Sequence, residues 1–252
     1  MGKVIAVANQ KGGVGKTTTC VNLCAALTEN GLSVLLCDMD PQGNATSGLG
    51  VDKNKDAPNM YNVLVEGIDV TGVIAKTPFG DVLPSNKILS GAGVELVTMQ
   101  AREYVLKTVL ASVRDKYDYI LIDCPPSLEM LTLNSLCAAD TVLIPVQCEY
   151  YALEGLSDLM TIIKMIKKSF NPELEIEGVL LTMYDSRTTF SFQVAAEIKK
   201  FFVQKIYNVA IPRNVRLAEA PSHGKPCLNY DRISRGSVAY LELAKEFLKR
   251  NQ

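Results

Sequence analysis

Residues 3–30 constrain the fold more than any other stretch of this sequence. A nearly all-apolar run, KVIAVAN (residues 3–9), is followed by the glycine-rich segment QKGGVGKTT and then by a helical pattern from Lys16 to Asn30. A short apolar run of this kind is typical of a parallel strand buried on both faces. A strand, a glycine loop and a helix in this order form the phosphate-binding unit of P-loop proteins, which predicts an α/β fold.

The rest of the chain repeats this alternation of apolar runs and helical patterns. We predict strands at residues 32–38, 117–123, 140–146 and 176–184, with shorter candidates at 81–86, 94–99 and 207–211. We predict helices at residues 101–116, 128–138, 152–169, 189–205 and 236–250. This order predicts a mostly parallel twisted sheet with helices on both faces. No Pro/Gly/Ser-rich linker divides the chain, so we expect residues 1–252 to form a single domain.

The glycine-rich segment has the chemistry of a phosphate site. It fits the pattern G-x-x-x-x-G-K-[ST] at Gly15, Lys16 and Thr17, although Gln10 stands at the position of the first glycine. Glycines let backbone N–H groups curl around phosphate oxygens, and the helix N-terminus that follows favours negative charge. Lys16 is expected to neutralise the β- and γ-phosphates, and the Thr17 hydroxyl to bind Mg²⁺. The residues expected to contact the nucleotide here are Gly12, Gly13, Val14, Gly15, Lys16, Thr17 and Thr18.

Acidic residues follow two other predicted strands. Asp123 ends the run YDYILID, and Asp38 and Asp40 lie at the end of LSVLLCD and just beyond it. Because ligands of parallel sheets bind beyond the carboxyl ends of the strands, we expect these carboxylates beside the glycine loop. There they could hold the metal or orient an attacking water. Aspartate is also a common turn and helix-capping residue, so each carboxylate taken alone is open to that interpretation.

Charge is unevenly distributed along the chain, although the net charge is −1. Residues 185–252 contain 12 Lys and Arg against 6 Asp and Glu, whereas residues 1–184 contain 14 against 21. A basic C-terminal quarter is a candidate surface for a polyanion such as nucleic acid. Solvated helix faces are the alternative interpretation of the same charge count.

Cysteine spacing and hydropathy bear on metal sites and on location. The 7 cysteines show no C-x-x-C spacing, and His223 is the only histidine, so we predict buried, reduced thiols rather than a metal cluster. No apolar run reaches the roughly 18 residues of a spanning helix, and the N-terminus lacks the features of a signal peptide. We therefore expect a cytoplasmic protein without a membrane partner.

Six motifs taken together point to one family. They are KGGVGKTTT, DMDPQGNATSGLG, DCPPSL, PVQCEYYALEGL, GVLLTMYDSRT and IPRNVRLAEAPSHGKP. In combination they resemble the ParA-type chromosome- and plasmid-partitioning ATPases, and most closely their short, Soj-like chromosomal branch. The likeness runs nearly end to end. This family belongs to the deviant Walker A group of P-loop ATPases, which also contains the MinD-like ATPases and the nitrogenase iron protein.

The resemblance gives a role to Lys11, a second lysine that the ordinary P-loop pattern does not require. Members of the family form a homodimer face to face around two ATP molecules, and the additional lysine reaches the phosphates of the partner. Gly12 matches a family glycine whose lack of a side chain lets two P-loops approach. ATP would then hold the dimer together, and hydrolysis to ADP and phosphate would weaken it.

The resemblance also assigns the other site residues. Asp40 would orient the hydrolytic water and so act with Lys11 and Lys16 in catalysis. The residues serving the Mg²⁺ shell would be Thr17, Asp38 and Asp123, and those contacting adenine would be Pro212 and Asn214. Hydrolysis in this family is slow and is stimulated by a partner.

The basic C-terminal quarter acquires a specific function from the same resemblance. Arg187 and Arg216 match the arginines with which Soj-like dimers bind double-stranded DNA without sequence preference. The implied partner is a ParB-type centromere-binding protein, and the implied location is the nucleoid. A salt bridge at the surface is the alternative role of each arginine.

Three related functions are weighed against partitioning. An iron protein would need cluster cysteines between subunits, and Cys124 and Cys137 are the only conceivable ligands. A MinD-like membrane ATPase would end in a basic amphipathic helix, but the stripe in residues 236–250 is expected to face the core. A cargo-positioning relative would share the same chemistry. Because a strand begins at residue 3, we expect no helix-turn-helix domain of the kind that long plasmid proteins carry.

Overall fold

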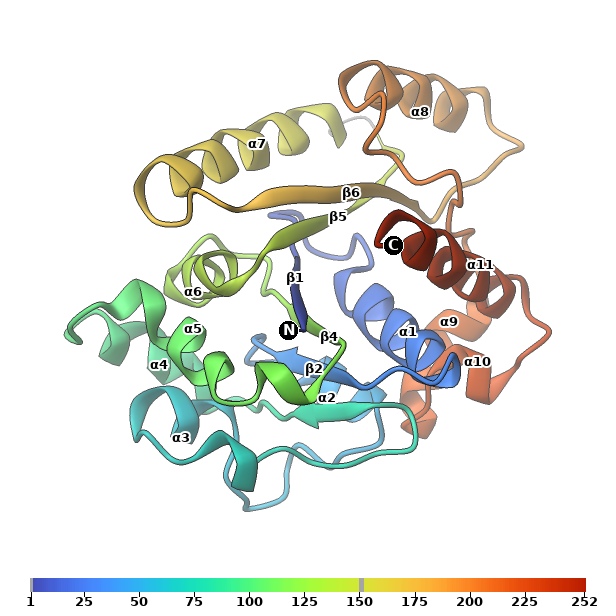
Figure 1. The fold of residues 1–252 in the computed structure, drawn as a ribbon. Coiled ribbons are helices and arrows are strands. Elements are labelled where there is room, and N and C mark those ends of the chain that lie inside the picture. The colour runs from blue at the N-terminus through green and yellow to red at the C-terminus, as the bar shows by residue number, and fades with distance from the viewer. Residues whose placement is uncertain (1, 150–151) are drawn as a thin grey trace.

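The computed structural model describes residues 2–149 and 152–252, and its described part contains a six-stranded parallel sheet (Figure 1). The strands lie in the order β3-β2-β4-β1-β5-β6, and every pairing is parallel. Their bounds are β1 Lys3–Val7, β2 Val34–Asp38, β3 Asp81–Leu83, β4 Tyr119–Asp123, β5 Thr141–Gln147 and β6 Glu175–Thr182. The predicted α/β class with a parallel sheet is confirmed.

Helices connect the strands and cover both faces of the sheet (Figure 1). Their bounds are α1 Lys16–Glu29, α2 Asn44–Gly48, α3 Met60–Val65, α4 Leu89–Leu96, α5 Val105–Ala111, α6 Met130–Ala138, α7 Ala152–Ser169, α8 Thr189–Phe201, α9 Val215–Glu219, α10 Cys227–Tyr230 and α11 Arg235–Arg250. Figure 1 shows α1 and α11 side by side on one face, and α5 and α6 on the other.

The sheet separates two hydrophobic cores. In β1, Val4 and Ala6 belong to the core under α5, α6 and α7, whereas Ile5 and Val7 belong to the core under α1 and α11. Successive side chains of a strand point to opposite faces, so an all-apolar strand is what a sheet covered on both sides requires. The apolar run at the start of the chain therefore forms the centre of the molecule.

Strand register brings the predicted site residues to one edge of the sheet. Asp123 at the end of β4 lies level with Val7 of β1 on one side and with Asp38 of β2 on the other. The chain leaves β1 into the glycine loop at this same edge. The fold thus places the loop and the two strand-end aspartates around one position.

Two of the predicted short strands are wrong. Residues 94–99 lie in α4 and the turn after it, because the buried residues Leu89, Ala92 and Leu96 recur with helical spacing. Residues 207–211 run beside β6 and form no strand: the backbone N–H groups of Tyr207 and Ile211 donate to it, and the isolated bridges lie just outside this range, at Ile206 and Pro212. The backbone N–H groups of residues 208 and 209 donate instead to the Glu246 carboxylate, at 2.9 and 3.0 Å.

The bounds of one predicted helix and the buried face of another need correction. The helix expected at residues 101–116 is broken, with one turn at Arg102–Tyr104, then α5, then a second turn at Arg114–Lys116. The residue before the first turn, Ala101, has a left-handed φ of 52°, which does not continue a helix. The stripe predicted at residues 236–250 faces the core only in part: Ala244 and Phe247 are buried, Leu241 and Leu248 are half-buried, and Val238 is exposed. Tyr240 and Leu243, which were not predicted, complete the buried face.

Candidate functional site

The glycine loop between β1 and α1 has the backbone of a phosphate cradle. Gly13 and Gly15 have φ values of 74° and 89°, a region that L side chains rarely adopt. The loop is fixed to the end of β6, because the Thr182 hydroxyl donates to the carbonyl of Val14 at 2.7 Å. Gly15 precedes the first turn of α1, so free N–H groups of that turn face the loop. Backbone donors and the helix dipole together favour an anion here.

The two lysines of the loop lie in different surroundings. Lys16 is buried, and its Nζ donates to the carbonyl of Lys11 at 3.1 Å. Burial lowers the pKa of Lys16, and the negative charge of Asp123 opposes that shift. Lys11 lies at the surface, where its Nζ forms a 3.1 Å ion pair with Glu149. Lys16 therefore serves the interior of the loop, whereas Lys11 is directed away from it.

The aspartates that end β2 and β4 are completely buried. Asp38 accepts hydrogen bonds from the backbone N–H and the hydroxyl of Thr46, both at 2.7 Å. Asp123 accepts a 3.6 Å contact from the Cys20 thiol through Oδ1, and its Oδ2 has no hydrogen-bond partner among the residues that the structure describes. A buried carboxylate oxygen without a donor needs a proton or a cation as its partner.

Electrostatics at this carboxylate pair point to a cation. Burial raises the pKa of Asp38 to about 6 and that of Asp123 to about 8, and the charge of Asp38 adds to the second shift. The Thr17 hydroxyl lowers the pKa of Asp123 in part. Carboxylate and hydroxyl oxygens are the ligands that Mg²⁺ prefers. These residues therefore fit a hard divalent cation beside the phosphate loop.

Asp40 lies between β2 and α2 with part of its surface exposed. Its Oδ1 accepts from the backbone N–H of Gln42 at 2.9 Å, and its carbonyl accepts from the Ser85 hydroxyl at 2.8 Å. Asp40 is thus a turn residue, as one interpretation of the sequence held. Its carboxylate still has acceptor capacity for a water, because each carboxylate oxygen offers two lone pairs.

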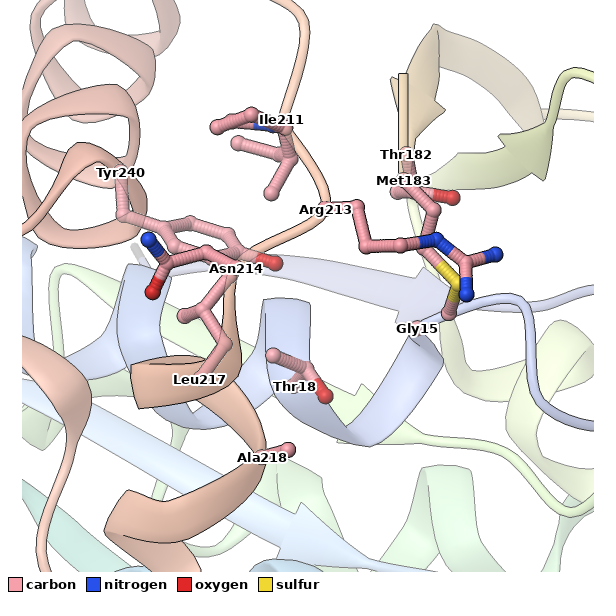
Figure 2. Close-up of a pocket in the computed structure, with 11 residues that line it drawn as sticks. Gly15, Thr18, Thr182, Met183, Ile211, Arg213, Asn214, Leu217, Ala218 and Tyr240 are labelled. Carbon is pink, nitrogen blue, oxygen red and sulfur yellow. The ribbon is translucent and has the colours of Figure 1, made fainter. Parts of the chain in front are cut away.

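A cavity of about 240 Å³ adjoins the loop (Figure 2). Figure 2 shows Asn214 and Tyr240 on one side of this cavity, and Met183 and Gly15 on the other. Pro212 also lines it, so the predicted adenine segment and the phosphate loop face one space. The complete lining is Gly15, Thr18, Thr182, Met183, Ile211, Pro212, Arg213, Asn214, Leu217, Ala218 and Tyr240.

Several of these lining residues were absent from the sequence prediction. Thr182 could have been found, because it lies two residues before the end of the predicted strand at 176–184, near the ligand-binding edge. Met183 has a left-handed φ of 48°, which no pattern in the sequence predicts. Tyr240 comes from the middle of α11, which the sequence predicted only as a helix packed on the core.

Arg187 and Arg216 lie on two segments that the fold joins beyond β6. The backbone N–H of Tyr184 donates to the carbonyl of Ile211 at 2.9 Å, which ties the two segments together. Both guanidinium groups reach the surface, with side chains 88% and 45% exposed. We call the surface formed by Arg187, Arg216 and the turns that carry them the arginine surface. It begins next to the cavity, since Met183 and Asn214 belong to the same two segments.

All 7 cysteines are buried and free, as predicted. Cys124 and Cys137 were the conceivable ligands of a cluster shared between subunits, and both lie in the core. Burial raises the pKa of Cys124 to about 12, which keeps its thiol protonated at neutral pH. Neither thiol can reach a second subunit in this conformation. Tyr150 and Tyr151, in the motif PVQCEYYALEGL, lie outside the described residues.

Comparison with known proteins agrees with this geometry. A family model described as "AAA domain" matches residues 2–176. The sporulation initiation inhibitor protein Soj of Bacillus subtilis is 57% identical over 248 residues, covering 98% of both chains. The chromosome partitioning protein ParA of Caulobacter vibrioides is 50% identical, covering 99% of this chain and 95% of that protein. The chain belongs to the ParA/Soj family of chromosome-partitioning ATPases.

Solved structures share this fold, and some of them contain nucleotide and magnesium. A Mycobacterium smegmatis protein named cobyrinic acid a,c-diamide synthase, with bound ADP and magnesium, has a TM-score of 0.87 and 39% identity. It covers 99% of this chain and 95% of its own. The cell division ATPase MinD of Pyrococcus furiosus has a TM-score of 0.80 and 28% identity, covering 99% of each chain. No helix in residues 2–149 or 152–252 has the length and apolarity that crossing a membrane requires.

Proposed function

We propose that this protein is an ATP-driven dimerisation switch for chromosome or plasmid partitioning. Its ATP-bound homodimer binds double-stranded DNA without sequence preference, and a ParB-type partner stimulates hydrolysis to ADP and phosphate. The observation that carries this proposal is that the Lys11 side chain points to the surface, where only a half-exposed ion pair with Glu149 holds it, and that Gly12 beside it has no need of glycine within its own chain. A Cβ on Gly12 would meet no atom within 4 Å, and its φ is not in the left-handed region.

Each part of the nucleotide has residues suited to hold it. The N–H groups of Gly13, Val14 and Gly15 and the Lys16 ammonium bind the phosphates, with Thr18 at the cavity wall. Mg²⁺, when bound, supplies positive charge at the β- and γ-phosphates. The residues that hold it are Thr17, Asp38 and Asp123. The cavity lined by Pro212 and Asn214 takes the adenine.

Lys11 completes the neutralisation from the other subunit. A triphosphate with one Mg²⁺ retains negative charge, and a second cation placed against it stabilises the complex. The ion pair of Lys11 with Glu149 is half exposed, so its loss costs little when Lys11 moves to a phosphate. Gly12 lets the partner's loop approach because no side chain intervenes. ATP thereby becomes part of the dimer interface.

Hydrolysis requires an oriented water, and Asp40 is the proposed orienting group. Its Oδ1 is already engaged by the N–H of Gln42, which leaves the other oxygen to accept from the water. We expect basal hydrolysis to be slow, because Asp40 is a partly exposed turn residue whose alignment depends on the loops around it. A ParB-type partner would accelerate the reaction by fixing that alignment.

The arginine surface is the proposed DNA contact. Phosphate contacts supply affinity without sequence information, which fits a protein that binds the nucleoid through exposed arginines. A single subunit presents Arg187 and Arg216, and the dimer presents both twice. We propose a cytoplasmic, nucleoid-associated protein formed by one ATPase domain. A cargo-positioning ATPase or a MinD-like membrane-associated ATPase is the alternative, and the 57% identity to Soj against 28% to MinD favours partitioning.

Analytical ultracentrifugation with and without ATP tests the proposal. The wild-type protein should sediment as a dimer with Mg-ATP and as a monomer with ADP. Lys11→Ala and Gly12→Val should stay folded and monomeric in both conditions. Lys116→Ala is the matched control, because Lys116 is exposed and precedes β4 at the opposite edge of the sheet. An ATP-dependent dimer of Lys11→Ala would contradict the proposed interface.

A further inference from the structure

The Arg187 guanidinium is held by a carboxylate of its own turn. Its Nε and Nη2 donate to the two oxygens of Asp185 at 2.9 and 2.8 Å, a bidentate arrangement. The backbone N–H of Arg187 donates to Asp185 as well, at 3.0 Å. These donors hold the pKa of Asp185 well below its ordinary value, with a smaller contribution from the charge of Arg213. Asp185 therefore carries its negative charge at every physiological pH.

Arg216 is held in a similar way on the neighbouring segment. Its Nη1 donates to Glu219 at 2.8 Å, and its Nε lies 3.1 Å from Asp231. Neither carboxylate is buried: their side chains are 40% and 27% exposed. Both arginines of the arginine surface thus meet carboxylates in the position that a DNA phosphate would take.

We propose that Asp185, Glu219 and Asp231 are internal competitors of the DNA phosphates and set the affinity of the arginine surface. This inference rests on the proposed DNA-binding function and adds the residues that weaken it. A guanidinium carries five N–H donors in one plane, and a neighbouring pair of them fits a carboxylate and a phosphate equally well. Only one of the two anions can occupy them at a time.

The energetics of exposed ion pairs make this competition reversible. Such pairs contribute little in water and are screened by salt, so a phosphate can displace the carboxylate. The free energy gained from each phosphate contact is nevertheless reduced by the free energy lost when the internal ion pair breaks. One subunit then gains little from binding DNA, whereas a dimer adds the small gains of two surfaces on one duplex. The carboxylates thereby keep the monomer off DNA without weakening the nucleotide site.

Removal of the Asp185 charge tests this inference. Asp185→Asn keeps an oxygen that accepts from the backbone N–H of Arg187, so the turn before α8 is retained. The matched control is Glu173→Gln, which changes the net charge equally at the opposite end of β6 and is exposed. In Mg-ATP, Asp185→Asn should bind a duplex more tightly than Glu173→Gln by roughly two- to fivefold for each subunit, the range of an exposed ion pair.

A double variant distinguishes release of Arg187 from a general change in charge. Asp185→Asn combined with Arg187→Ala should bind no more tightly than Arg187→Ala alone, because no guanidinium remains to be released. Equal affinity of Asp185→Asn and Glu173→Gln would overturn the inference while leaving wild-type DNA binding intact. An Asp185→Asn gain that persists without Arg187 would overturn it too. If neither the wild-type protein nor Asp185→Asn binds DNA in any nucleotide state, the proposed function fails with it.

Glu219→Gln gives an independent test at the second arginine. It should strengthen DNA binding by a smaller factor than Asp185→Asn, because Asp231 still holds the Nε of Arg216. A gain in both single variants that is lost with the matching arginine would establish the competition at both positions. No gain for Glu219→Gln would restrict it to Asp185 and overturn the role given to Glu219.

Discussion

The metal end of the site and the arginine surface hold their charges in opposite ways. Asp38 and Asp123 are completely buried and lie on the ends of central strands, whereas Arg187 is 88% exposed on a turn. Among the described residues, Oδ2 of the buried Asp123 has no hydrogen-bond donor, whereas the exposed Arg187 already has a carboxylate partner. This difference supports our two proposals, that the first region receives a cation and that the second exchanges one anion for another.

The largest expected effect is on catalysis, at the partly exposed aspartate beside the buried pair. Asp40→Ala should lower the rate of ATP hydrolysis by roughly 10²–10⁴-fold, the usual contribution of a group that handles the reacting water. ATP-dependent dimerisation should persist, so the variant should accumulate as a DNA-bound dimer. Phosphate release and sedimentation measure the two effects separately. Wild-type turnover would contradict the assignment, and loss of nucleotide binding would make Asp40 a ligand of the metal instead.

The next effect is on the free energy of unfolding, which we expect to rise when the buried Asp123 is replaced. Because burial raises the pKa of Asp123 to about 8, the folded protein binds a proton there that the unfolded chain releases near pH 4. That stabilisation is present at low pH and is lost as the pH rises toward 8. Asp123→Asn should therefore raise the free energy of unfolding without Mg²⁺ by about 1–3 kcal/mol at pH 8.5, and by less at pH 5.

Denaturant unfolding at the two pH values, each with and without Mg-ATP, checks this prediction. Mg-ATP should stabilise the wild-type protein and should have a much smaller effect on the variant. A variant that is less stable than the wild type at pH 8.5 would show that Asp123 is a structural residue.

Two glycines of the loop separate backbone geometry from dimerisation. Gly15→Ala places a side chain at φ 89°, which should lower the stability of the monomer by about 1–2 kcal/mol. Gly12→Ala meets no atom and no unfavourable φ, so the monomer should unfold at the wild-type temperature. Thermal unfolding without nucleotide compares the two variants. A clear loss of stability in Gly12→Ala would show that Gly12 serves its own chain rather than the dimer.

The smallest effect on the folded protein belongs to the arginine surface. Arg187→Ala should leave the midpoint of thermal unfolding within roughly 2 °C of the wild-type value, because an exposed ion pair contributes little. DNA affinity should fall about equally for unrelated sequences, and ATP-dependent dimerisation should be unchanged. A loss confined to one sequence would indicate base contacts rather than phosphate contacts.

The buried half of the site could be predicted from the sequence because strand ends fix it. Asp38 and Asp123 close apolar runs, and parallel register then aligns them with the loop after β1. The same logic placed Lys16 and Gly15 at the start of a helix. Burial and periodicity leave a clear pattern in the sequence wherever the backbone is regular.

The parts of the fold and of the site that the sequence did not predict depend on contacts between distant segments. Residues 207–211 have the composition of a strand, but Glu246 of α11 takes their backbone donors. Tyr240 lines the cavity from a helix whose pattern indicated only core packing. The sequence contains the carboxylates that hold Arg187 and Arg216, but it does not show that they contact these arginines. Those contacts form only when the turns fold.

A DNA-binding titration in three nucleotide states tests the ATP-gated switch most directly. The wild-type protein is titrated onto two unrelated duplexes with Mg-ATP, with Mg-ADP and without nucleotide, at several salt concentrations. We predict tight binding with Mg-ATP alone, equal for both duplexes, with log K falling by roughly 0.9 per log unit of salt for each phosphate neutralised. Equal binding in all three states, or a strong preference for one duplex, would contradict the switch.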